Sequence, residues 1–163
     1  MTSTPARDRD AAGRPRNARP RDGLGRPLPR DAPAGVERVP DKLDMPLDDA
    51  IDLAQAYLDT GRPFHAHEVL EALWKSQPES ERDLWQGLAQ LAVGLTHALR
   101  GNVTGALALL DRGGDRVSRY VGDPHGIAID DVVATTGACA QALRQDGGVR
   151  PEQFRLRLKT LTQ

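Results

Sequence analysis

A chain of 163 residues has room for one ordinary domain. Its formal net charge of -1 argues against nucleic-acid affinity of the whole chain, and its aromatic content of only 4% requires a core built mainly from Leu, Ala and Val. No apolar run approaches the ~18 residues of a membrane span, and we expect no secretory signal because the N-terminus lacks an apolar segment.

The first segment, residues 1–44, is rich in Arg, Pro, Asp and Gly and nearly free of large apolar side chains. It cannot bury enough surface to offset its ordering entropy, which predicts a disordered or extended N-terminal arm. One alternative is an extended strap whose arginines dock on acidic groups of the body. Another is a basic arm for RNA, through Arg14, Arg16, Arg19 and Arg21. Interspersed aspartates and the absence of aromatic side chains make nucleic-acid binding weak at most.

Two helices are predicted next. The first covers residues 46–60, because apolar residues recur at helical spacing and Gly61 stops it. The second begins at Pro63, whose missing N–H suits a first turn, and continues to Ser76 without a Gly or another Pro. The turn between them is very short, so the two helices are expected to be antiparallel neighbours.

The second predicted helix carries a polar face beside its aliphatic one. At about 100° per residue, His67, Glu71 and Trp74 fall within roughly 60° of one another, and Glu68 borders this sector. His67 and Glu71 are one turn apart and can touch, whereas His65 points away from His67. Because an acidic residue stabilises a helix better on the N-terminal side of its partner, helix stabilisation alone is a weak explanation for the pair.

The spacing His67-x-x-x-Glu71-x-x-Trp74 resembles the bacterial and archaeal family called domain of unknown function 309, which is typified by His-x-x-x-Glu-x-x-Trp/Tyr. The resemblance includes two further blocks, residues 86–92 and residues 100–106. It covers roughly residues 47–121 in all. It implies a small all-helical fold and metal binding by the motif. It implies no established activity, and no catalytic residue can be carried over from the family.

A third helix is predicted to open near Ser80 and Asp83, which form a start similar to a capping box. It is expected to be the central helix of the core because leucines form a continuous stripe along it, at Leu84, Leu88, Leu91, Leu95 and Leu99. A second row is polar and consists of Gln86, Gln90 and His97. Gly94 lies between them, and a close contact with a neighbouring helix is its favoured explanation.

Asn102 is predicted to cap a fourth helix, in which Gly113-Gly114 is expected to be a weak point or a bend. A loop follows, and its His125 is expected to be exposed to solvent. A fifth helix, capped by Asp130 or Asp131, should run to about Gln145.

The segment 147–163 is predicted to be a C-terminal extension. It either forms a short helix or is extended, because its apolar residues alternate at Phe154, Leu156 and Leu158. The single cysteine, Cys139, cannot form an internal disulfide, so we expect a cytoplasmic protein.

The predicted fold is therefore all-α: a compact antiparallel helical bundle of about five to six helices. Its domain covers residues 45–146, between the arm at 1–44 and the extension at 147–163. The sequence leaves a homo-oligomer open.

The candidate pocket combines the polar faces of the second and third helices: His67, Glu68, Glu71, Trp74, Gln86, Gln90 and His97. We hypothesise that it binds a divalent metal ion, with His67 and Glu71 as ligands, or else a small molecule. A metal site needs more than two protein ligands, so further residues of the pocket would have to complete it.

Two alternatives to this hypothesis stay open. In the first, the protein is a structural or protein–protein interaction module, and His67–Glu71 is only a buried polar cluster. In the second, it is a metal-dependent, hydrolase-like enzyme in which Glu68 or Glu71 acts as general base. No nucleophile elbow, phosphate loop or dinucleotide fingerprint accompanies these residues, so the sequence does not decide whether the protein is an enzyme.

Overall fold

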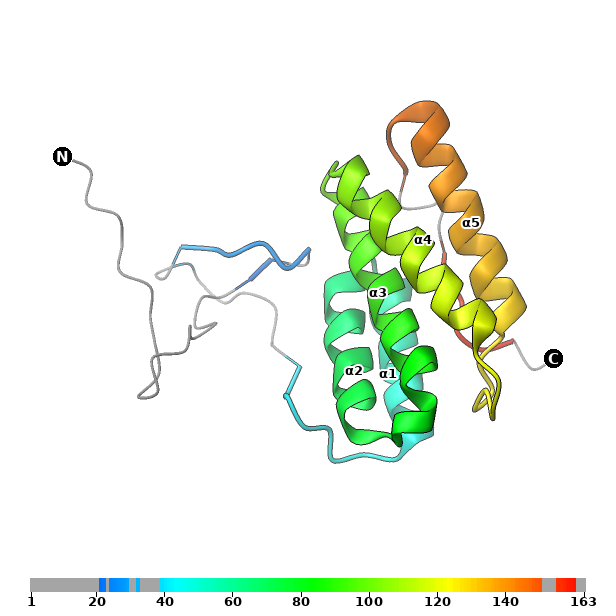
Figure 1. Ribbon diagram of the computed structural model, residues 1–163. Coiled ribbons are helices and arrows are strands. Elements are labelled where there is room, and N and C mark those ends of the chain that lie inside the picture. Colours follow the sequence, from blue (N-terminus) through cyan, green and yellow to red (C-terminus); the bar gives the residue numbers. More distant parts are fainter. Residues whose placement is uncertain (1–20, 23, 30–31, 33–38, 151–154, 161–163) are drawn as a thin grey trace.

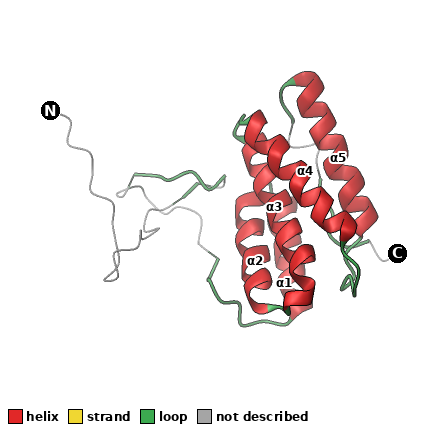
Figure 2. Cartoon of the chain, in the orientation of Figure 1, coloured by secondary structure: helices red, strands yellow, loops and turns green. Residues whose placement is uncertain are grey.

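The computed structural model describes residues 21–22, 24–29, 32, 39–150 and 155–160. Within them the chain forms five α-helices: α1 (Leu47–Asp59), α2 (Pro63–Ser76), α3 (Arg82–Leu99), α4 (Val103–Arg119) and α5 (Ile129–Asp146), with a 3-10 turn, η1 (Glu79–Glu81). The all-α prediction is confirmed, since the described residues contain isolated bridges but no strand (Figure 2). None of these helices combines the length and the apolar character needed to cross a lipid bilayer.

Helix α3 lies at the centre of the bundle, between α2 and α4, as the leucine stripe predicted (Figure 1). Leu84, Leu88 and Leu91 are completely buried, whereas Leu99, at the end of the stripe, is only half-buried. Trp85 is also completely buried and is the largest side chain of the core. The aliphatic faces of α1 and α2 close the core on one side of α3, and α4 and α5 close it on the other.

Helices α3 and α4 approach closely because glycines stand at their contact. A Cβ added to Gly113 would lie 2.8 Å from the carbonyl oxygen of Gly87 and 2.9 Å from Leu91 Cδ2. At Gly94 an added Cβ would lie 3.0 Å from Leu110 Cδ2, so the expected structural contact is confirmed. Helix α4 continues through Gly113-Gly114 without interruption, and the expected weak point there stays a prediction. A glycine there lets α3 approach without interrupting the helix.

Of the predicted helix caps, only Asn102 is confirmed, since its side chain accepts a hydrogen bond from the Gly105 N–H. The capping box at Ser80 is wrong: η1 precedes α3, whose N-cap is Glu81. The Asp130 or Asp131 cap is also wrong, because the N-cap of α5 is Ala128. Both aspartates instead lie in the first turn, where a carboxylate still favours the positive end of the helix dipole.

The expectation that His125 is solvent-exposed is wrong. Its Nε2 lies 2.9 Å from Glu81 Oε1, and its ring packs on Trp85 with 5.8 Å between centroids. The other oxygen of Glu81 accepts a hydrogen bond of 2.9 Å from the Trp85 indole N–H. Glu81 therefore ties the α4–α5 loop to the start of α3 and leaves the His125 side chain 20% exposed.

The described parts of the C-terminal extension, residues 147–150 and 155–160, contain no helix, so the helical alternative is wrong there. Leu156 and Leu158 are buried. The Gln55 side chain of α1 donates to the Leu156 carbonyl at 3.1 Å and accepts from the Leu158 N–H at 2.7 Å. A side-chain amide thus pairs with the extended backbone as a neighbouring strand would. Phe154 lies outside the described residues.

Two described parts of the N-terminal arm contact the helical body, and docking of its arginines on acidic groups of the body stays a prediction. One is a turn in which Asp22 Oδ1 accepts hydrogen bonds from the N–H groups of Leu24 and Arg26. The other includes Val39, which is buried in the core. Residues 14, 16 and 19, which the RNA alternative invokes, lie outside the described residues.

Candidate functional site

Helix α2 presents three faces, each to a different part of the chain. The first is apolar and buried in the core: Ala66, Val69, Leu70 and Leu73. The second shares a cavity with α3 and α4 and consists of His67, Glu71 and Trp74. The third shares a cavity with the arm and consists of Phe64, Glu68 and Ala72. The polar residues of the motif are therefore divided between two faces.

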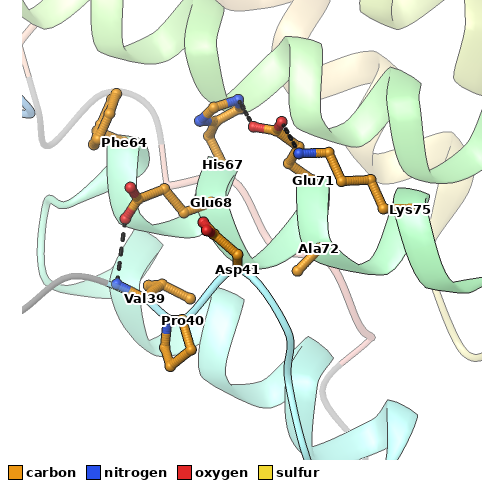
Figure 3. A pocket seen from close by; sticks show the side chains of 9 residues that line it. All are labelled: Val39, Pro40, Asp41, Phe64, His67, Glu68, Glu71, Ala72 and Lys75. Atoms are coloured by element: carbon orange, nitrogen blue, oxygen red, sulfur yellow. Dashed lines mark hydrogen bonds and ion pairs between the residues drawn. The ribbon is translucent and has the colours of Figure 1, made fainter. Parts of the chain in front are cut away.

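His67 and Glu71 form the polar centre of α2. His67 Nε2 lies 3.2 Å from Glu71 Oε2, and Lys75 Nζ lies 2.6 Å from the other carboxylate oxygen (Figure 3). All three residues are one helical turn apart, so the backbone of a single helix positions them. The carboxylate is therefore held from both sides and fixes the orientation of the imidazole.

The His67 imidazole is mostly buried, with 21% of its side chain exposed. This burial lowers its pKa below the usual value, against the opposing effect of the Glu71 carboxylate. His67 is therefore neutral at neutral pH and carries one proton. Because Nε2 faces the carboxylate, the proton belongs on Nε2 and Nδ1 keeps its lone pair. Nδ1 is buried and has no hydrogen-bond partner in the described part of the chain.

Two cavities flank this pair. The larger one, about 230 Å³, is bounded by α2 and the arm: Val39, Pro40, Asp41, Phe64, His67, Glu68, Glu71, Ala72 and Lys75 (Figure 3). The smaller one, about 170 Å³, is bounded by α2, α3 and α4: His67, Glu71, Trp74, Gln86, Ala89, Gln90, Val93 and Leu109. His67 and Glu71 contribute to the walls of both cavities.

The structure brings most of the predicted pocket residues together. Trp74, Gln86 and Gln90 share the smaller cavity with the His67–Glu71 pair, and Glu68 lines the larger one. His97 lines neither cavity, and its Nδ1 lies 3.0 Å from Asn102 Nδ2 at the end of α3. Seven residues separate it from Gln90, which is about 10 Å along a helix, too far to share a small cavity.

Sequence reasoning missed two components of the site. Lys75 follows Glu71 by four residues, so the helical spacing alone was sufficient to place it beside the carboxylate. The wall formed by residues 39–41 had no such signal, because nothing in the sequence relates the arm to one particular face of α2.

Among the described residues, the donor set beside His67 is small for a metal site. No group of three or more His, Cys, Asp or Glu side chains in the described part of the chain is arranged to hold a metal ion. His67 and Glu71 supply two donor atoms on one face. Structural and catalytic zinc sites use three or four protein ligands.

Lowering the pH is expected to destabilise the protein through His67. Its pKa is lowered in the folded state, so the unfolded chain binds a proton at higher pH than the folded chain. This contribution to the free energy of unfolding is therefore complete above the ordinary value of 6.5 and declines as the pH falls below it. Urea titrations between about pH 5 and 8 should show a smaller decline for His67→Gln. Equal declines in both proteins would contradict the assignment.

Part of the chain is similar in sequence to a known protein family and to a bacterial protein. Residues 51–109, from α1 into α4, match the family described as "Domain of unknown function (DUF309)". The chain is 42% identical over 64 residues to "Uncharacterized protein YpuF" of Bacillus subtilis (strain 168), an alignment that covers 34% of this chain and 37% of that protein. No solved structure matches. The helical segment 51–109 is therefore similar to the DUF309 family, which confirms the family resemblance expected from the sequence.

Proposed function

We propose that the cavities beside His67 and Glu71 bind a small polar molecule. The observation that carries this proposal is the state of His67: a neutral imidazole, fixed by a carboxylate, on the wall of both cavities. Its buried Nδ1 has no partner among the described protein groups. An unpaired buried acceptor costs about 1–3 kcal/mol, and a ligand that donates a hydrogen bond there removes this cost.

The size and charge of the cavities narrow the class of ligand. Volumes of about 230 and 170 Å³ lie below the roughly 300–1,000 Å³ of sites for drug-sized molecules. Among the described residues, the larger cavity is lined by the carboxylates of Asp41, Glu68 and Glu71 and by the ammonium group of Lys75. In the smaller cavity Gln90 Oε1 is a second buried acceptor without a partner among the described residues. This chemistry favours a small ligand with N–H donors and a positive charge, such as an amine.

A divalent metal ion is the second candidate. The observation in its favour is the approach of His67 Nε2 to Glu71 Oε2, 3.2 Å apart on one helical face. The two-donor set supports it less well than a small molecule. The hydrolase-like alternative, in which Glu68 or Glu71 acts as general base, depends on that metal ion and is therefore supported no better than the metal site. We also propose a cytoplasmic location, which rests on the single cysteine, Cys139.

A thermal-shift screen with two sets of probes tests the proposal. One set contains small amines, and the other contains zinc, manganese, iron and nickel salts. A ligand at about 100 times its Kd stabilises the native state by about 2.7 kcal/mol, so a binder should raise the melting temperature clearly. His67→Gln should abolish the rise in melting temperature because it removes the Nδ1 acceptor. Glu71→Gln should abolish it because the imidazole of His67 is no longer held by a carboxylate.

The matched control is His97→Gln, which makes the same substitution outside both cavities and should keep the rise in melting temperature. Stabilisation by amines alone supports the small molecule, and stabilisation by metals alone supports the metal site. If no probe stabilises the native protein, or if His67→Gln responds as the native protein does, the pair is a structural cluster.

A further inference from the structure

The third face of α2 is covered by the N-terminal arm. Phe64, Glu68 and Ala72 follow one another at intervals of four residues and therefore form one stripe along the helix. All three line the larger cavity, and two described parts of the arm lie against this stripe. This face lies largely on the outer side of α2, since neither Phe64 nor Glu68 belongs to the buried core.

The first contact lies at the Phe64 end of the stripe. The backbone of Gly25 packs directly on the Phe64 ring, where any larger residue would overlap it, and its φ of +72° also favours glycine. The Arg21 guanidinium lies over the same ring, 5.3 Å from its centroid. From α3, Arg100 donates a hydrogen bond to the Leu24 carbonyl oxygen. Residues 21, 24 and 25 of this turn are therefore fitted to the helical body.

The second contact lies at the Glu68–Ala72 end. The Val39 N–H donates to Glu68 Oε2 across 3.4 Å, and the Val39 side chain is only 4% exposed (Figure 3). Pro40 and Asp41 are exposed and form the outer wall of the larger cavity. Beneath this wall, Ala72 is only 6% exposed. It is a buried apolar residue that lines the inner side of the cavity, next to the contiguous hydrophobic cluster of the bundle.

We infer that Val39–Asp41 is a lid that controls access to the larger cavity beside His67 and Glu71. Among the described residues, this segment is held on α2 by the buried Val39 side chain and by the 3.4 Å hydrogen bond from the Val39 N–H to Glu68 Oε2. Release of Val39 opens the cavity while the helices stay packed, because the rest of the core, from α1 to α5 with Ile127, Leu156 and Leu158, is formed without it. The lid lies outside the segment 51–109 that matches the family.

Cysteine labelling tests the lid without any ligand. An Ala72→Cys substitution places a thiol beneath the lid, and Ala56→Cys places one on the exposed face of α1 as the reference. The native Cys139 gives little background, because it is buried and its burial raises the pKa of the thiol to about 12. In the full chain we expect iodoacetamide to label the thiol at position 72 at least about tenfold more slowly than the thiol at position 56, as expected for a site that is closed most of the time.

Two further substitutions should open the lid. Val39→Asp places a charge in the buried position, and Glu68→Ala removes the acceptor of the Val39 N–H. In the Ala72→Cys background each should raise the labelling rate, and Val39→Asp should bring it close to the rate at the exposed position. Lys42→Gln is the matched control, because it changes the net charge by the same amount at an exposed position of the arm. Circular dichroism should show an unchanged helical bundle in every variant.

Equal labelling at positions 72 and 56 in the native arm, or a rate at position 72 that neither variant changes, would overturn the lid. The inference rests on the proposed function in one respect: the proposed ligand is the molecule whose entry the lid would control. If the labelling behaves as expected and no probe in the thermal-shift screen binds, the lid stands and the proposed function fails. If probes bind and the labelling shows no protection at position 72, the proposed function stands and the lid fails.

Discussion

Replacing Leu91 with alanine is expected to lower the free energy of unfolding by about 2–5 kcal/mol, the range for cavity-forming changes in a core. Leu91 is completely buried at the centre of α3, and its terminal carbons reach the backbone of α4 at Gly113. The helices are already in backbone contact beside it, so they cannot move inward to fill the space. The loss should therefore lie in the upper part of the range.

Urea denaturation followed by circular dichroism measures this effect. The matched control is Leu99→Ala, the same change at the half-buried end of the same leucine stripe, which should cost clearly less. A cost below about 1 kcal/mol for Leu91→Ala would mean that α3 does not pack as described.

Adding one methyl group to α4 should have opposite effects at two adjacent glycines. At Gly113 the new Cβ would lie 2.8 Å from the Gly87 carbonyl oxygen, which belongs to backbone and cannot rotate away. Gly113→Ala must therefore force α3 and α4 apart, and overpacking of this kind costs about 1–3 kcal/mol. At Gly114 the nearest atom would be Thr136 Oγ1 at 4.0 Å, an ordinary contact. Gly114→Ala should stabilise the protein by up to about 1 kcal/mol, because alanine is the better helix former.

Thermal melts of the two variants should be measured together. Both variants gain the same helix propensity from alanine, so the difference between their melting temperatures reports the contact at Gly113 alone. Destabilisation of both by the same amount, or stabilisation of both, would show that the two helices do not meet at Gly87 and Gly113.

Apolar spacing was sufficient to predict the helices and the core. Leucines at helical intervals place α3 at the centre, and Pro63 and Gly61 delimit neighbouring helices because of their backbone chemistry. The predictions were wrong where a polar side chain forms contacts with residues that are distant in the sequence. Glu81 binds Trp85 and His125, which lies 44 residues away, and a sequence pattern gives no sign of such a contact.

The same division applies to the candidate site. The contact between His67 and Glu71 follows from helical spacing and was predicted. The grouping with Gln86 and Gln90 was predicted too, from the polar row that these residues form along the third helix. His97 continued the same row in the sequence but lies about two turns beyond the cavity, since a shared helical face says nothing about position along the axis. The arm wall at residues 39–41 depends on tertiary docking alone.

The central claim, that the cavities beside His67 bind a small polar molecule, is tested most directly by native mass spectrometry. Native protein and the His67→Gln variant would each be equilibrated with an extract of small molecules, desalted under non-denaturing conditions and weighed intact. The account predicts a non-covalent adduct on the native protein that denaturation releases and that His67→Gln does not carry. Native protein and variant with the same adducts, or with none at saturating extract, would contradict it.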